Sequence, residues 1–144
     1  MDESTTRKLA DILSNISNET EMQNYMQQPK INDFFKNPID YFRSLPSVKL
    51  MTDTEIIDAS GIERSYYYQI MKGTKNPSRD KVIRLCIGTG LTLRETTRML
   101  ELSEHATLYS KNRRDIIISV AINQHISVID TNILLDKYNE VPLS

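Results

Sequence analysis

Residues 78–108 and residues 113–143 align with each other without a gap, at a constant offset of 35 residues. Both segments carry a helix-start signal at the same place, Thr92 followed by Glu95 in the first and Ser127 followed by Asp130 in the second. Each segment is therefore predicted to form a helix, a short turn and a second helix. The identical pairs are Arg79/Arg114, Asp80/Asp115, Ile83/Ile118, Ile87/Ile122, Thr96/Thr131, Leu100/Leu135 and Leu108/Leu143.

The repeat resolves an ambiguity in the apolar run IIISVAI at residues 116–122. Alone, this run would be predicted as a buried strand, because β-branched residues favour strands. Its repeat partner at 81–87 belongs to a predicted helix, so residues 114–123 are also predicted to be helical. A helical hairpin cannot bury its apolar face alone, and we expect the second hairpin to stack on the first. The sequence thus predicts an all-α protein.

A second informative stretch, residues 52–73, has the pattern of two short helices joined by a tight turn. Thr52 and Glu55 form a capping box at the start of the first helix. Gly61 supplies the left-handed conformation that the turn needs, and Gly73 ends the second helix, predicted over 63–71. Two helices joined by a short turn that contains glycine form a helix-turn-helix.

A helix-turn-helix suits DNA because the major groove, about 12 Å wide, admits one helix. The outward side chains of helix 63–71 are then expected near base edges, and those of the loop after it near phosphates. The predicted base-reading residues are Arg64, Ser65, Tyr68 and Gln69. The predicted phosphate-binding residues are Lys72, Thr74, Lys75 and Asn76.

The run TEIIDASGIERSYYYQIMKGTKNPSRDKVIRL resembles the phage-repressor-type (Xre-like) helix-turn-helix family, and its most specific part is ASGI…YYYQIMKGTKNPS. The resemblance spans roughly residues 52–102. It implies a lambda-repressor-like helix-turn-helix core, here with an appended repeated helical hairpin, in which Arg64 and Ser65 read bases and Lys72 and Lys75 touch DNA. With LYSKNRRDIII and VIDTNILLDKY after the motif, the chain also resembles small cytoplasmic regulators of low-GC Gram-positive bacteria.

Three carboxylates depart from that family pattern. Glu63 replaces the usual small residue before the recognition helix, and Asp53 and Glu55 lie where the first helix normally faces phosphate. Acidic groups there repel DNA. The alternative function is a protein-interaction adaptor that keeps the fold without binding DNA and uses Tyr66 and Tyr68, both expected to be at least partly exposed, as its partner surface.

The net charge of −1 hides an uneven distribution along the chain. Residues 60–114 carry eleven Lys/Arg against five Asp/Glu, whereas residues 1–59 carry six against ten and residues 115–144 one against four. The basic block begins at the predicted recognition helix, which favours double-stranded DNA as the partner.

The domain organisation predicted from these patterns has three parts: an acidic N-terminal helical arm at 1–30, the helix-turn-helix core at 31–102 and the C-terminal hairpin at 103–144. One recognition helix covers only a few base pairs, so a homodimer is expected, through the C-terminal hairpin or the arm. Whether the arm packs on its own chain or forms a dimer contact stays open.

Several classes of protein are disfavoured. No Gly-rich phosphate loop, nucleophile elbow or metal-ligand spacing occurs, so we expect no enzymatic activity, no metal and no cofactor. The histidines, His105 and His125, are expected to be turn residues, and the single cysteine, Cys86, a core residue suited to a reducing cytoplasm. No stretch reaches the roughly 18 apolar residues of a membrane helix.

Overall fold

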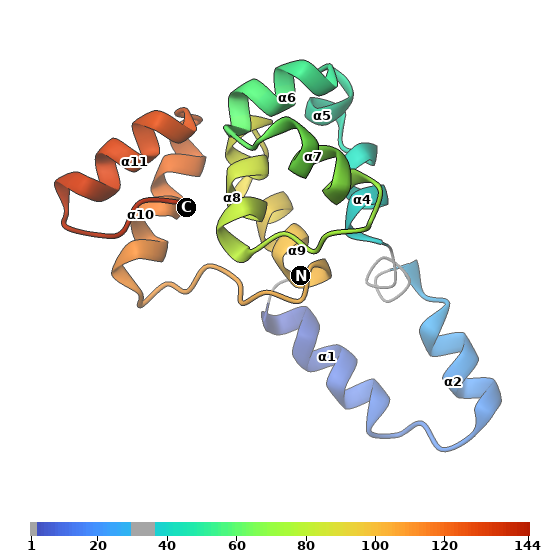
Figure 1. The fold of residues 1–144 in the computed structure, drawn as a ribbon. Helices are drawn as coiled ribbons and strands as arrows, with labels where there is room; N and C mark the ends of the chain where they lie inside the picture. The colour runs from blue at the N-terminus through green and yellow to red at the C-terminus, as the bar shows by residue number, and fades with distance from the viewer. Residues whose placement is uncertain (1–2, 30–36) are drawn as a thin grey trace. The chain divides into compact units, whose positions relative to one another are not determined.

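The computed structural model describes residues 3–29 and 37–144, and all of the regular secondary structure in these residues is helical, as predicted (Figure 1). The chain divides into two compact units, Met1–Lys36 and Asn37–Ser144, which are described separately. The domain boundary predicted between residues 30 and 31 lies outside the described residues. No helix in the described part of the chain is long and apolar enough to cross a membrane.

The first unit contains α1 (Glu3–Leu13) and α2 (Glu19–Met26). The side chain of Asn18 accepts a hydrogen bond from the backbone N–H of Glu21 at 2.8 Å, which caps the start of α2. Large apolar side chains of both helices are solvent-exposed, among them Ile12 and Met22.

The second unit is built from eight helices in the described residues 37–144 (Figure 1). The buried faces of these helices form one apolar cluster, with Phe42, Tyr67, Ile83 and Leu100 among its most buried members. In chain order the helices are α4 (Pro38–Ser44), α5 (Pro46–Lys49), α6 (Asp53–Ser60), α7 (Arg64–Met71), α8 (Arg79–Gly88), α9 (Leu93–Leu102), α10 (Arg113–Gln124) and α11 (Val128–Lys137).

The helix from Arg113 to Gln124 confirms the prediction of a helix rather than a strand at 114–123. The starts of α9 and α11 also lie where the sequence places them. Thr92 and Glu95 form a complete capping box, and Ser127 accepts a hydrogen bond from the backbone N–H of Asp130. Each half of the repeat therefore consists of a helix, a turn and a second helix.

Helices α6 and α8 approach each other very closely at Gly88. A Cβ atom at this position would lie 2.8 Å from the backbone N of Ser60 and 2.9 Å from the carbonyl carbon of Ala59. Glycine is therefore required at residue 88 by the backbone of the neighbouring helix. The equivalent position in the second repeat, Asn123, is exposed.

The two hairpins join through two reciprocal ion pairs. Arg79 of the first repeat contacts Asp115 of the second at 3.0 Å, and Arg114 of the second contacts Asp80 of the first at 2.9 Å. Since Arg79 is equivalent to Arg114 and Asp80 to Asp115, each repeat offers the other the same pair of residues. This exchange is the signature of a two-fold relation.

Backbone hydrogen bonds follow the same symmetry. The guanidinium of Arg79 donates to the carbonyls of residues 106 and 107, and that of Arg114 donates to those of residues 141 and 142, again 35 residues on. The N–H of Tyr109 donates to Asp115, and the N–H of Ser144 donates to Asp80. The second hairpin thus packs on the first as expected, but by two-fold exchange and not by simple repetition along an axis.

Candidate nucleic-acid interface

Helix α7 is placed by α6 and by the turn between them. The capping box of Thr52 and Glu55 starts α6, and Gly61 ends it in the left-handed conformation, with φ of 67°. This positive φ is what favours glycine at residue 61; a Cβ there would also lie 2.8 Å from Nη1 of Arg84, at the end of a long side chain that can move. Ile62, next in the turn, is buried and anchors the start of α7 in the core.

The two faces of α7 differ sharply in exposure. Tyr67 and Ile70 are 0% and 1% exposed and belong to the core. The four residues predicted to read bases are all exposed and lie on the opposite face, because they follow the i, i+1, i+4, i+5 spacing of one helix surface. This face lines a surface hollow of about 560 Å³. Its lining consists of the four predicted base-reading residues, Arg64, Ser65, Tyr68 and Gln69, together with Glu63 and Lys72.

Glu63 caps α7 with its side chain. One carboxylate oxygen accepts hydrogen bonds from the hydroxyl of Ser65 at 2.6 Å and from its N–H at 3.1 Å, and the other accepts from the N–H of Tyr66 at 3.2 Å. The hydrogen bonds from Ser65 and Tyr66 lower the pKa of Glu63 below its ordinary value. The hydroxyl of Ser65 uses its proton on Glu63, so toward a ligand it offers its oxygen as an acceptor.

The other two unusual carboxylates are also engaged within the α6–α7 unit. The hydroxyl of Tyr67 donates to Asp53 at 2.6 Å, and burial together with this bond raises the pKa of Tyr67 well above its ordinary range. Glu55 accepts the backbone N–H of Thr52 at 2.9 Å, which lowers the pKa of Glu55. Asp53 and Glu55 therefore both have structural roles within the α6–α7 unit. The sequence pattern predicted such a role only for Glu55.

The loop after α7 presents the predicted phosphate-binding residues Lys72, Thr74, Lys75 and Asn76, all exposed. The N–H and the hydroxyl of Thr74 both donate to the carbonyl of Gln69, at 3.0 and 3.1 Å, which folds the loop back on α7.

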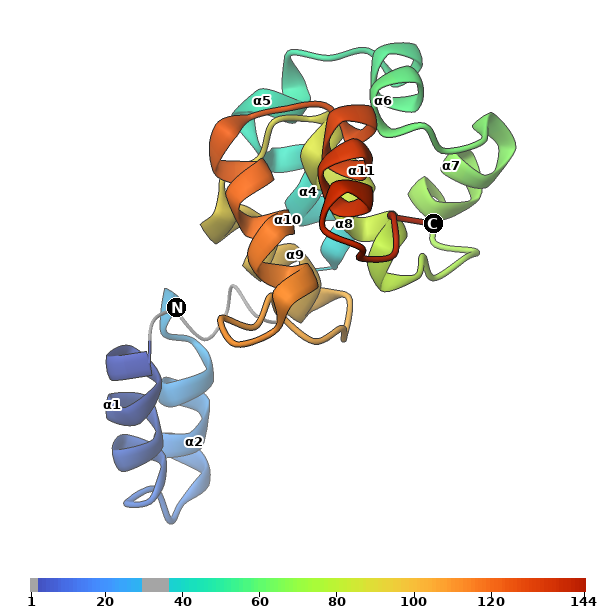
Figure 2. The same cartoon turned by 90° about the vertical axis from the view of Figure 1, so that its left-hand side faces the viewer.

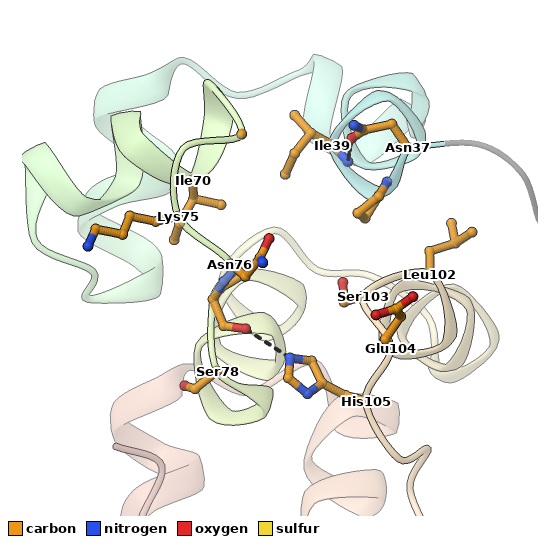
Figure 3. Close-up of a pocket in the computed structure, with 13 residues that line it drawn as sticks. Asn37, Ile39, Ile70, Lys75, Asn76, Ser78, Leu102, Ser103, Glu104 and His105 are labelled. Carbon is orange, nitrogen blue, oxygen red and sulfur yellow. Dashed lines mark hydrogen bonds between the residues drawn. The ribbon is translucent and has the colours of Figure 1, made fainter.

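A cavity of about 520 Å³ lies beside this loop, lined by the start of α4, by Ile70, by Gly73 and residues 75–78 of the loop, and by residues 102–105 at and after the end of α9 (Figure 3). Nε2 of His105 lies 2.8 Å from the carbonyl oxygen of Pro77 and ties the loop to the segment after α9. His105 was expected to be a turn residue; it instead follows the turn at residues 103–104 and contacts the loop. Lys75 extends away from the cavity in this view.

Several arginines of the basic block seen in the sequence are engaged in contacts within the protein. Arg79 and Arg114 form the ion pairs between the hairpins, Arg113 contacts Glu140, and Arg84 donates to the carbonyls of Ser60 and Leu143. The charge segregation along the chain therefore reflects internal packing as well as a surface property.

Two cations near α7 were missed by the sequence analysis. Arg43 and Lys49, both exposed, line a hollow of about 220 Å³ beside Asp53 and Tyr67. They belong to α4 and α5, and only the packing of those helices brings them to the start of α6. No spacing signal in the sequence links them to α7.

Comparisons with protein-family models, with curated proteins and with solved structures found no match to this chain. Among the described residues, no group of three or more His, Cys, Asp or Glu side chains is placed to hold a metal ion.

Proposed function

We propose that the protein is a sequence-specific, DNA-binding transcriptional regulator with a lambda-repressor-like helix-turn-helix core, in which α7 is the recognition helix. One observation carries the proposal. Helix α7 is buried on one face through Tyr67 and Ile70, while its other face exposes Arg64, Tyr68 and Gln69 side by side. A helix held in this way is suited to enter the major groove.

Each exposed side chain on α7 has a chemical role in this proposal. Arg64 can chelate guanine through O6 and N7, and Gln69 can chelate adenine through N6 and N7. The hydroxyl oxygen of Ser65 accepts a hydrogen bond from a base amino group. Tyr68 supplies an apolar ring edge for a thymine methyl group.

The phosphate contacts lie on both sides of α7. The loop residues Lys72 and Lys75 are exposed after the helix, and Arg43 and Lys49 are exposed near the start of α6. Lysine and arginine contacts to phosphate position a protein on the duplex without reading its sequence. Two α7 helices are required to read two half-sites about one helical turn apart, so the regulator acts as a homodimer.

The test is selection from a random duplex DNA library with the purified protein and with the Arg64→Ala/Ser65→Ala variant. Arg94→Ala is the matched control, because Arg94 is an exposed arginine on α9, outside the α6–α7 unit. We expect an enriched two-fold motif that the double variant loses and the control keeps. In binding assays, Arg64→Ala should cost about 1–3 kcal/mol and relax specificity at one base. An equal loss for every DNA sequence would refute base reading by Arg64.

A second candidate function is a protein-interaction adaptor, favoured by the ordered tyrosine pair on α7. The rings of Tyr67 and Tyr68 meet edge to face with centroids 5.3 Å apart, and Tyr68 is 37% exposed. An aromatic side chain fixed in this way is a typical anchor for a protein partner. The two functions differ in salt dependence, because DNA binding weakens steeply as salt is added and a tyrosine-anchored protein contact barely changes.

A further inference from the structure

The second hairpin has an exposed apolar face on both of its helices. Ile116 and Val120, one turn apart on α10, are 43% and 44% exposed, and Ile129 and Ile133, one turn apart on α11, are 73% and 62% exposed. We call these four residues the outer face. Exposed apolar patches above a few hundred Å² mark sites of interaction in soluble proteins.

The first hairpin shows what normally happens to this face. There, α6 packs on α8 and α4 packs on α9, so that Leu85, the equivalent of Val120, is 1% exposed. Arg98, the equivalent of Ile133, lies over the ring of Tyr41 in α4, 6.0 Å from its centroid. In the second hairpin, no helix of residues 37–144 packs against the outer face in this way, and Figure 2 shows α10 and α11 on the near side of that unit.

The second hairpin has apolar residues at exposed positions where the first hairpin has charged ones. The first hairpin has the partly buried Lys81 and Arg98 and the exposed Arg94, and the second hairpin has an exposed isoleucine at each of the equivalent positions, 116, 133 and 129. Solvent exposure alone would favour charged or polar side chains at these three positions of the second hairpin. The outer face therefore has the composition of a surface that is covered in the working protein.

We propose that a second copy of this chain covers the outer face, in a two-fold dimer that pairs α10 and α11 with their counterparts. A two-fold interface sets one patch against itself, so a rim of one charge would repel its own copy. The rim here is mixed: Asp136 and Lys137 on α11 carry opposite charges, and Asn123 and Gln124 on α10 are neutral. The reason for a dimer rests on the proposed DNA-binding function, whereas its location on α10 and α11 rests on the comparison of the two repeats.

The make-up of the face also fits an interface. A stable interface buries about 800 Å² on each partner, with an apolar centre and a polar rim. The four side chains of the outer face would form that centre, and the polar side chains beside them would form the rim.

The test uses the full chain and the double substitution Ile129→Arg/Ile133→Arg, which gives the second hairpin the residues that the first has at 94 and 98. Both sites are well exposed, so the fold should be unaffected, and circular dichroism checks this. The matched control is Ile12→Arg/Met22→Arg, which places the same charges on exposed apolar residues of the N-terminal arm. Sedimentation equilibrium over a wide range of protein concentration measures the dimerisation constant.

We expect a wild-type dimer, an unchanged control and at least about a 100-fold weaker dimer in the Ile129→Arg/Ile133→Arg variant, because like charges from both copies would be buried at its centre. A wild-type monomer at every concentration would overturn the proposal. So would a variant that still dimerises, and loss of the dimer in the arm control alone would assign the interface to the arm.

DNA binding is measured separately, so the two proposals fail separately. If the protein dimerises through the outer face but enriches no DNA motif, the dimer stands and the regulator function falls. If the protein reads DNA but the Ile129→Arg/Ile133→Arg variant keeps its affinity for a two-half-site operator and its dimer, the regulator stands and the outer face falls.

Discussion

Replacing Arg114 with alanine should destabilise the protein far more than replacing its neighbour Arg113. The guanidinium of Arg114 donates to both carboxylate oxygens of Asp80, at 3.1 and 2.9 Å, and to the carbonyls of Val141 and Pro142, at 2.8 and 3.1 Å. Arg113 makes a single 3.2 Å contact with Glu140.

The expected magnitude follows from burial. The side chains of Arg114 and Asp80 are 19% and 17% exposed, whereas that of Arg113 is 74% exposed. Breaking a fully buried pair costs about 3–5 kcal/mol, and a surface pair contributes about 0–1 kcal/mol. We therefore expect Arg114→Ala to lower the free energy of unfolding by about 2–3 kcal/mol, and Arg113→Ala by less than about 0.5 kcal/mol.

Urea unfolding followed by circular dichroism measures both variants. Arg114→Lys should recover less than half of the loss, because an ammonium group cannot bind a carboxylate through two parallel hydrogen bonds. A double-mutant cycle with Asp80→Asn isolates the pair itself. Equal losses for Arg113→Ala and Arg114→Ala, or no coupling with Asp80, would refute the two-fold ion-pair account of the hairpin interface.

Three further predictions concern other parts of the second unit. Partial burial acts to raise the pKa of Asp80, but hydrogen bonds from Arg114 and from the backbone N–H of Ser144 lower this pKa below its ordinary value of 3.8. The ionised Asp80 therefore stabilises the fold above pH 3.8, and this contribution is lost as the pH falls below that value. Acid titration of unfolding should show a shallower loss of stability in Arg114→Ala than in wild type. Gly88→Ala should destabilise by about 1–2 kcal/mol, because the clash with the backbone of α6 outweighs the better helix propensity of alanine, whereas Asn123→Ala at the equivalent exposed site should be neutral or stabilising. Tyr67→Phe should cost about 1 kcal/mol, because it removes the hydrogen bond to the carboxylate at the start of α6.

Each of these has a clear contrary result. The pH prediction fails if wild type and Arg114→Ala lose stability in parallel as acid is added. The glycine prediction fails if Gly88→Ala and Asn123→Ala shift the denaturation midpoint in the same direction. A Tyr67→Phe protein as stable as wild type would show that the hydroxyl contributes nothing to anchoring α7.

Much of the candidate site was readable from the sequence. The structure places Arg64 and Gln69 outward as expected, and Tyr67 and Ile70, on the opposite face of α7, lie in the core. The roles of the nearby carboxylates were not readable. Asp53 looked like a group that repels DNA, and only the packing of α7 on α6 shows that it accepts the hydroxyl of Tyr67.

The sequence by itself determined where most helices begin and end. Signals such as Thr52 with Glu55, Asn18 with Glu21 and the glycine at 61 act through hydrogen bonds between residues at most four apart, so they are legible in any short window. The 35-residue repeat added the fold class, since it identified residues 114–123 as helical.

Only the tertiary structure decided how the repeats face each other and which face is left uncovered. The pairs of Arg79 with Asp115 and of Arg114 with Asp80 join residues more than 30 positions apart, so no local sequence signal identifies them. The same holds for the outer face of α10 and α11. Its apolar residues are visible in the sequence, but whether a neighbouring helix covers them depends on long-range packing that no local spacing encodes.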